Sequence, residues 1–218
     1  MSSVFGPGRE VKTKLILATP FVAVGLGHLW SLMRFPAPFV DEAWNISRAW
    51  AYLRTGRVFG ALDAGVFDRY DGYWTFFPWL YHFLLSSALR LFSTPELLAG
   101  RIVSLVCGFA LLAAVYAIAD SLGGRRLGLL SLLLASVSWP FFYSAHLARS
   151  DILVSALGFA AIATHLRNER QSVWACALSG LLIGVAFETH PNSMIYGPAI
   201  VMLYFLQWRW RMFRQRTF

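Results

Sequence analysis

Six apolar runs of helical length constrain this chain more than any other feature of its sequence. None of the runs contains Asp, Glu, Lys or Arg, and they lie at positions 15–33, 102–119, 127–147, 152–166, 173–187 and 193–207. A water-soluble domain could not expose so little charge over such lengths. The pattern therefore predicts an all-α fold, a polytopic transmembrane helical bundle of about six spans.

Charge and composition support the same class. Of the 218 residues 57% are hydrophobic and 14% are charged, and the formal net charge is +8. In a soluble protein this excess of basic residues would suggest nucleic acid. Here the basic residues separate the apolar runs, so orientation in a membrane and contact with anionic lipid explain them better. Membrane lipid is the expected partner, and nucleic acid is not.

A seventh run, 76–89, is shorter and contains Pro78 and His82. Cytoplasmic loops of membrane proteins carry the excess of Lys and Arg. If 76–89 does not span, these basic segments all lie on one side of the membrane: the N-terminus, the turns at Arg125 and Arg170 and the tail at Arg211. We therefore expect an interfacial helix at 76–89, a long external loop at 34–101 with juxtamembrane helices within it, and an integral protein of the cell (inner) membrane with a cytoplasmic N-terminus.

Carboxylates gather on the external side of this topology. Asp41 and Glu42 follow a Pro- and Phe-rich approach, where two adjacent acids are costly unless they are paired or used. Asp151 lies in a short external turn beside Arg149. The alternative interpretation is structural: Asp41 caps a helix at 43–53, and Ser150 or Asp151 caps the next helix while Arg149 pairs with Asp151.

Other polar residues on this side carry weaker signals. His190 lies in the third external turn, near Glu188, and Arg101 opens the second apolar run, where it could reach a lipid phosphate. Asp63, Asp68 and their neighbours are interpreted as a solvated loop. Phosphate-loop, dinucleotide-binding, zincin and serine-hydrolase motifs do not occur in the sequence.

Several short motifs resemble the glycosyltransferase-C superfamily, in particular the dolichyl-phosphate-mannose protein mannosyltransferases and the aminoarabinose lipid A transferases. The resemblance covers positions 36 to 195, and the motifs occur in the family's order and spacing. They are Asp41-Glu42, Phe77-Pro78-Trp79-Leu80-Tyr81-His82, Ala99-Gly100-Arg101-Ile102, Gly123-Gly124-Arg125-Arg126, Leu147-Ala148-Arg149-Ser150-Asp151 and Thr189-His190-Pro191-Asn192.

The resemblance implies a membrane glycosyltransferase that moves a sugar from a polyprenyl-phosphate donor to a protein, lipid or glycan acceptor outside the cytoplasm. It implies Asp41 as general base, with Glu42 and Asp151 as further catalytic acids. It also implies Arg101, Arg149 and His190 as contacts to the donor or its phosphate, although many relatives have lysine at the position of His190. Such enzymes have about twice as many spans, so positions 1–218 are expected to be the truncated N-terminal catalytic module.

Two matters stay open at this level. No cofactor is expected, but carboxylate oxygens suit Mg²⁺ or Mn²⁺, and a divalent metal between Asp41, Glu42 and Asp151 is an alternative. A transporter or lipid-binding scaffold, in which the same acids relay protons or bind a cation, is the alternative to an enzyme, and an inactive truncated transferase is a third. The lack of charges in mid-span favours interfacial catalysis.

Overall fold

The computed structural model describes residues 7–71, 79–167 and 172–208, and in these ranges the chain forms helices joined by loops, without β-strands. The all-α class is confirmed. The elements in chain order are α1 (Pro7–Ser31), α2 (Val40–Thr55), η1 (Asp68–Tyr70), α3 (Trp79–Leu89), α4 (Leu97–Ser136), α5 (Trp139–Ala145), α6 (Asp151–Leu166), α7 (Val173–Phe187), η2 (Pro191–Ile195) and α8 (Tyr196–Trp208).

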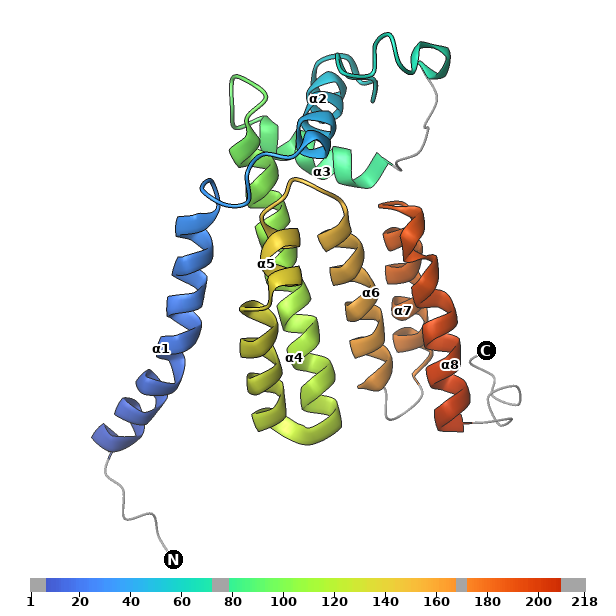
Figure 1. Ribbon diagram of the computed structural model, residues 1–218. Coiled ribbons are helices and arrows are strands. Elements are labelled where there is room, and N and C mark those ends of the chain that lie inside the picture. The colour runs from blue at the N-terminus through green and yellow to red at the C-terminus, as the bar shows by residue number, and fades with distance from the viewer. Residues whose placement is uncertain (1–6, 72–78, 168–171, 209–218) are drawn as a thin grey trace, which may run out of the picture.

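Helix α4 is in fact a hairpin of two helical limbs. Gly123 and Gly124 leave the helical conformation, and the φ of +77° at Gly124 lies in the left-handed region that glycine adopts without steric cost. A first limb at 97–122 therefore turns back into a second at 125–136, and Figure 1 shows the two limbs side by side. This turn separates the first two apolar runs after the external loop, as the sequence predicts.

The number of spans is not established by helix length. By length and composition α4 is the one helix in the described part of the chain that could cross a membrane. Helices α6 and α7 are apolar, but their 16 and 15 residues rise only about 22 to 24 Å, less than the ~30 Å hydrocarbon core. The expectation of about six spans therefore stays a proposal.

One expected helix is interrupted. The apolar run at 127–147 divides into the second limb of α4, which ends at Ser136, and the short α5, which begins at Trp139. Pro140 explains the break, because it has no N–H to donate and its ring would clash with the carbonyl of Ser136, four residues earlier.

The described parts of the external loop expected at 34–101, residues 34–71 and 79–101, lie at one end of the molecule. Figure 1 shows α2 and the following loop at this end, with α3 lying across the bundle rather than along it. The main buried cluster sits here, between α2, α3, α4 and the loop before α6, and includes Ile46, Tyr81, Leu85, Ala99 and Ala148. The expected interfacial helix corresponds to α3, while Phe77 and Pro78 lie outside the described residues.

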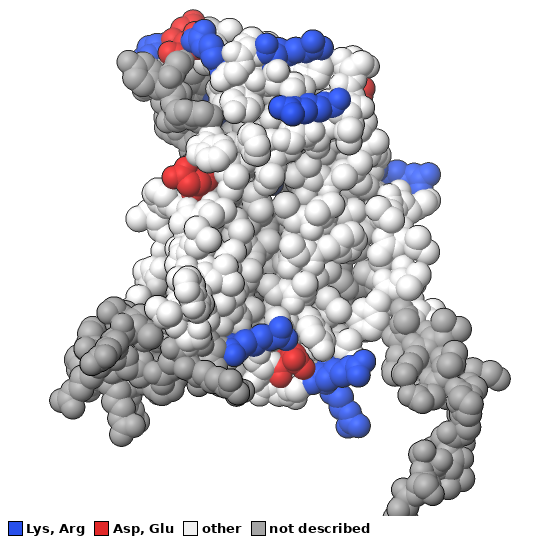
Figure 2. Space-filling model, turned by 180° about the vertical axis from the view of Figure 1, so that it is seen from behind, with Lys and Arg blue, Asp and Glu red and all other residues white. Residues whose placement is uncertain are grey.

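Charged side chains lie near the two ends of the molecule. On the face drawn in Figure 2, a broad belt without Lys, Arg, Asp or Glu separates them. Large apolar side chains are exposed on the helices, among them Trp174, which is 81% exposed, and Leu181, which is 62% exposed. A surface of this kind requires lipid or further protein around it.

Candidate functional site

The two adjacent acids of α2 face different environments. The helix begins at Val40 after Phe39, so Asp41 and Glu42 both lie in its first turn. The alternative in which Asp41 caps this helix is wrong, because Phe39 holds the cap position and the side chain that accepts its N–H is that of Glu42. The Asp41 side chain is 40% exposed, whereas that of Glu42 is fully buried. Adjacent positions on a helix differ by about 100°, which sends one carboxylate outward and the other inward.

Glu42 is held by a buried ion pair with Arg101 of α4. The Nε and Nη2 atoms of Arg101 donate to the two carboxylate oxygens at 2.9 Å each, and both side chains are 0% exposed. The same guanidinium donates to the carbonyls of Leu32 and Pro36 at 2.8 and 3.0 Å. Since all four of these contacts are to groups in the protein interior, the geometry favours a positioning role for Arg101 over contact with a donor phosphate.

Glu42 also fixes the loop before α6. Its Oε1 accepts a hydrogen bond from the N–H of Ala148 at 2.9 Å, and its Oε2 accepts one from the N–H of Phe39 at 2.9 Å. The loop can come this close because Gly100 has no side chain: a Cβ there would lie 2.5 Å from the Cβ of Ala148. One buried carboxylate therefore sets the position of α2 relative to Arg149 and Asp151.

Arg149 brings the two candidate carboxylates together. Its Nε lies 2.9 Å from Oδ2 of Asp151, and its Nη1 lies 3.5 Å from Oδ2 of Asp41. The three side chains are between 34% and 43% exposed, so water and a ligand can reach them. Ion pairs this exposed contribute little to stability. Asp41, Arg149 and Asp151 thus form an accessible group built from α2 and the start of α6, and we call it the outer carboxylate group.

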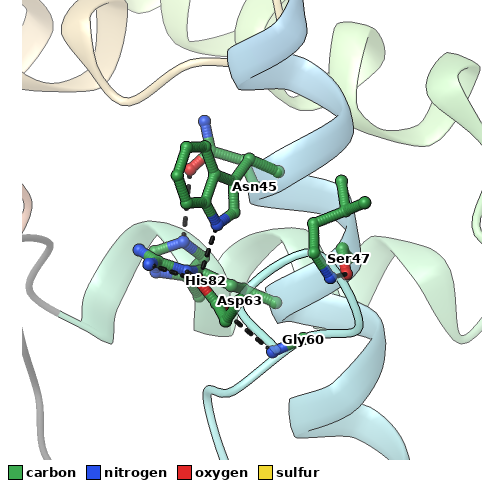
Figure 3. A network of polar contacts seen from close by, with 8 residues as sticks. Asn45, Ser47, Gly60, Asp63 and His82 are labelled. Carbon is green, nitrogen blue, oxygen red and sulfur yellow. Dashed lines mark hydrogen bonds and ion pairs between the residues drawn. The ribbon is translucent and has the colours of Figure 1, made fainter. Parts of the chain in front are cut away.

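A further polar network supports the same helix. The Nδ2 of Asn45 donates to the carbonyl of Ala148 at 3.1 Å, and its Oδ1 lies 3.2 Å from Nε2 of His82 on α3 (Figure 3). Because Asn45 lies one turn after Asp41, these contacts link α2 to both α3 and the loop before α6. Asn45 was not predicted as a functional residue, because no sequence motif includes it.

Asp63 is buried, so its interpretation as part of a solvated loop is wrong. Its carboxylate accepts hydrogen bonds from Arg48 at 2.7 and 3.0 Å, from Trp44 Nε1 at 2.6 Å and from the N–H of Gly60 at 2.8 Å (Figure 3). Burial alone would raise the pKa of Asp63, but these hydrogen bonds and the charge of Arg48 outweigh burial and lower it. The network folds the loop after α2 back onto that helix.

Glu188 and His190 lie between α7 and η2, where Glu188 ends α7 and His190 precedes η2. The Nδ1 of His190 accepts the N–H of Asn192 at 3.1 Å, which caps η2. The carbonyl of Glu188 accepts the N–H of Leu80 at 3.2 Å and so joins α7 to the start of α3.

In the described ranges no group of three or more His, Cys, Asp or Glu side chains is placed to hold a metal ion. Both oxygens of Glu42 already accept hydrogen bonds inside the protein. The sequence-based alternative of a metal between Asp41, Glu42 and Asp151 would therefore require Glu42 to leave Arg101.

An all-helical chain with a belt of exposed apolar side chains and acids at one end is typical of an integral membrane protein with an interfacial site. Comparison with protein families specifies the class: the model of the dolichyl-phosphate-mannose-protein mannosyltransferase family matches residues 77–218, and the chain belongs to that family. Its members are integral membrane glycosyltransferases of the glycosyltransferase-C type. No curated protein and no solved structure matches the chain significantly. Arg101, Arg149, Asp151 and His190 lie within the matched range, whereas Asp41 and Glu42 precede it.

Proposed function

We propose that this protein transfers a sugar from a polyprenyl-phosphate donor to an acceptor hydroxyl, with Asp41 as general base. The observation that carries the proposal is the outer carboxylate group, in which an exposed arginine lies between two exposed carboxylates at the end of the bundle. Family membership supports glycosyl transfer in general. The acceptor class, whether protein, lipid or glycan, follows only from the resemblance.

The proposed step balances without a cofactor. The carboxylate of Asp41 takes the proton of the acceptor hydroxyl, the acceptor oxygen forms a bond to the anomeric carbon, and the bond from that carbon to the phosphate oxygen breaks. The leaving group is the polyprenyl phosphate, on which negative charge collects. A cation near that phosphate lowers the barrier, and a positioned base typically contributes about 10² to 10⁴ in rate.

Exposure divides the arginines between two roles. Arg149 is 34% exposed and can turn from the carboxylates toward a phosphate, to which it would donate charge-assisted hydrogen bonds. Arg101 is buried against Glu42 and would act by holding Asp41 and Arg149 in place. In this proposal Asp151 orients Arg149 or the acceptor, and His190 is a peripheral donor contact. The bundle is inserted with about six spans, with the site outside the cytoplasm and the Arg125 turn inside.

The decisive experiment is Asp41→Asn, assayed in membranes with saturating polyprenyl-phosphate sugar. Asn keeps the size of the side chain but cannot accept the proton, so we expect transfer to fall by about 10² to 10⁴ with insertion and donor binding retained. Asp71→Asn is the matched control, because Asp71 is likewise an exposed acid that pairs with an arginine, Arg57. Near-normal turnover in Asp41→Asn would refute the assignment and favour a transporter or scaffold.

A further inference from the structure

A groove of about 490 Å³ lies between α1 and the two limbs of α4, away from the outer carboxylate group. Its size is within the range of sites that hold small molecules. Helix α1 contributes Phe21, Val24 and Gly25, and α4 contributes aromatic and aliphatic side chains from both limbs. Of the side chains that the structure describes there, the polar ones in the lining are Tyr116, Arg125 and Ser136.

The groove forms because hydrogen bonds hold α1 against the bundle near its C-terminal end, at His28. The Nε2 of His28 donates to the carbonyl of Ser136 at 2.9 Å, and the Nε2 of His146 donates to the carbonyl of His28 at 3.1 Å. Toward its N-terminal end α1 leans away from α4, as Figure 1 shows. The wedge between them is walled by apolar side chains and would face the hydrocarbon of a bilayer.

Among the lining residues whose side chains the structure describes, Arg125 is the charged one. It directly follows the Gly123–Gly124 turn, so it lies where the second limb begins, and it is exposed. The first limb, 97–122, has 26 residues, which at 1.5 Å each place this turn about 39 Å from Leu97. The groove thus has a cation at the end of the bundle opposite Glu42 and Asp41.

We propose that this groove binds an anionic glycerophospholipid, with an acyl chain along α1 and the phosphate at Arg125. Basic sites between membrane helices bind anionic lipid headgroups, and a guanidinium donates charge-assisted hydrogen bonds to phosphate. A sugar donor that reacts at Asp41 must hold its phosphate at the other end, so this lipid is not the substrate. Only this exclusion of the sugar donor rests on the proposed function; the lipid site itself goes beyond the transferase activity.

The test is native mass spectrometry of the purified 218-residue protein in detergent, titrated separately with phosphatidylglycerol, with phosphatidylcholine of the same acyl chains and with polyprenyl phosphate. The unmodified protein should bind phosphatidylglycerol more tightly. Arg125→Gln should weaken that binding about fivefold and leave phosphatidylcholine unchanged. Gly25→Leu should weaken both, because no atom lies within 4 Å of a Cβ at Gly25 and the new side chain fills the groove without a clash.

Two matched controls separate the groove from general effects. Arg126→Gln removes the neighbouring charge, which does not line the groove, and Gly184→Leu adds the same side chain at an equally open glycine of α7. Both should bind phosphatidylglycerol within twofold of the unmodified protein. Equal affinity in Arg125→Gln, tighter binding of polyprenyl phosphate than of phosphatidylglycerol, or a dimer that Gly25→Leu dissociates would each overturn the proposal. No outcome depends on sugar transfer, so failure of the Asp41 assignment leaves this test unaffected.

Discussion

At the residue scale, Arg101 should be the basic side chain whose removal destabilises the protein most. Arg101→Met leaves the buried carboxylate of Glu42 without its counter-charge, which typically costs about 3–5 kcal/mol. The loss is measured as a lower free energy of unfolding in detergent. Arg167→Met is the control, since Arg167 pairs with Asp120 at 3.3 Å with both side chains more than 30% exposed, and should cost under about 1 kcal/mol. Equal losses would contradict the positioning role of Arg101.

Asp63 should make stability depend on acidity. Its pKa is lowered in the folded protein, so its contribution is complete above the unfolded pKa of about 3.9 and is lost as the pH falls through the lower folded value. Asp63→Asn should therefore lower the melting temperature at pH 7, and the difference from the unmodified protein should shrink below about pH 4. The exposed Asp68→Asn serves as control. A difference that grows at acidic pH would contradict the network.

The candidate site was predictable only in part from single residues. Asp41, Arg149 and Asp151 stand out because acids and arginine are costly beside apolar runs, and the structure brings all three together. The burial of Glu42 and the exposure of Asp41 were not predictable, since they depend on which side of α2 packs against Arg101. Asp63 was misjudged for a similar reason: Arg48 and Trp44, which bury it, lie 15 and 19 residues earlier.

At the element scale, close contact between α4 and the loop before α6 should depend on Gly100. In Gly100→Ala the new Cβ would lie 2.5 Å from that of Ala148, while its distances to Leu85 and Ile46 are ordinary. Overpacking of this kind costs about 1–3 kcal/mol, and it should also impair transfer by displacing Arg149.

The matched rescue is the double variant Gly100→Ala with Ala148→Gly, which removes the clashing atom and should recover most of the loss. A double-mutant cycle of unfolding free energies measures this coupling. Additive effects of the two substitutions would show that the loop does not rest on Gly100.

Helices were easier to predict than their interruptions. The runs at 152–166 and 173–187 match α6 and α7 within one residue, because charge ends each run where the helix ends. The break at Pro140 was missed, since an apolar run shows no change in composition where a proline stops hydrogen bonding. The turn at Gly123–Gly124 was predicted because Arg125 and Arg126 follow it.

At the scale of the whole molecule, the helices hold the acidic groups at one end of the bundle and the basic turns at the other. The outer carboxylate group and the Asp63 network occupy one end, and Arg125, Arg126 and the Arg167–Asp120 pair belong to turns at the other. In a membrane this separation would leave the acids free for catalysis at one surface, while the basic turns contact anionic lipid at the other.

That separation predicts opposite accessibility for the two ends. In a background with Cys107 and Cys176 replaced by serine, Asp151→Cys and Glu188→Cys should react with an impermeant maleimide in intact cells. Arg126→Cys and Ser172→Cys should react only after permeabilisation. The two limbs of α4 return the chain to the surface it left, and α6 and α7 repeat this, so the four positions alternate between surfaces if each limb crosses the bilayer. Labelling of position 126 but not 151 in intact cells would show that the protein has the opposite orientation. Equal labelling of all four positions would exclude the spanning arrangement.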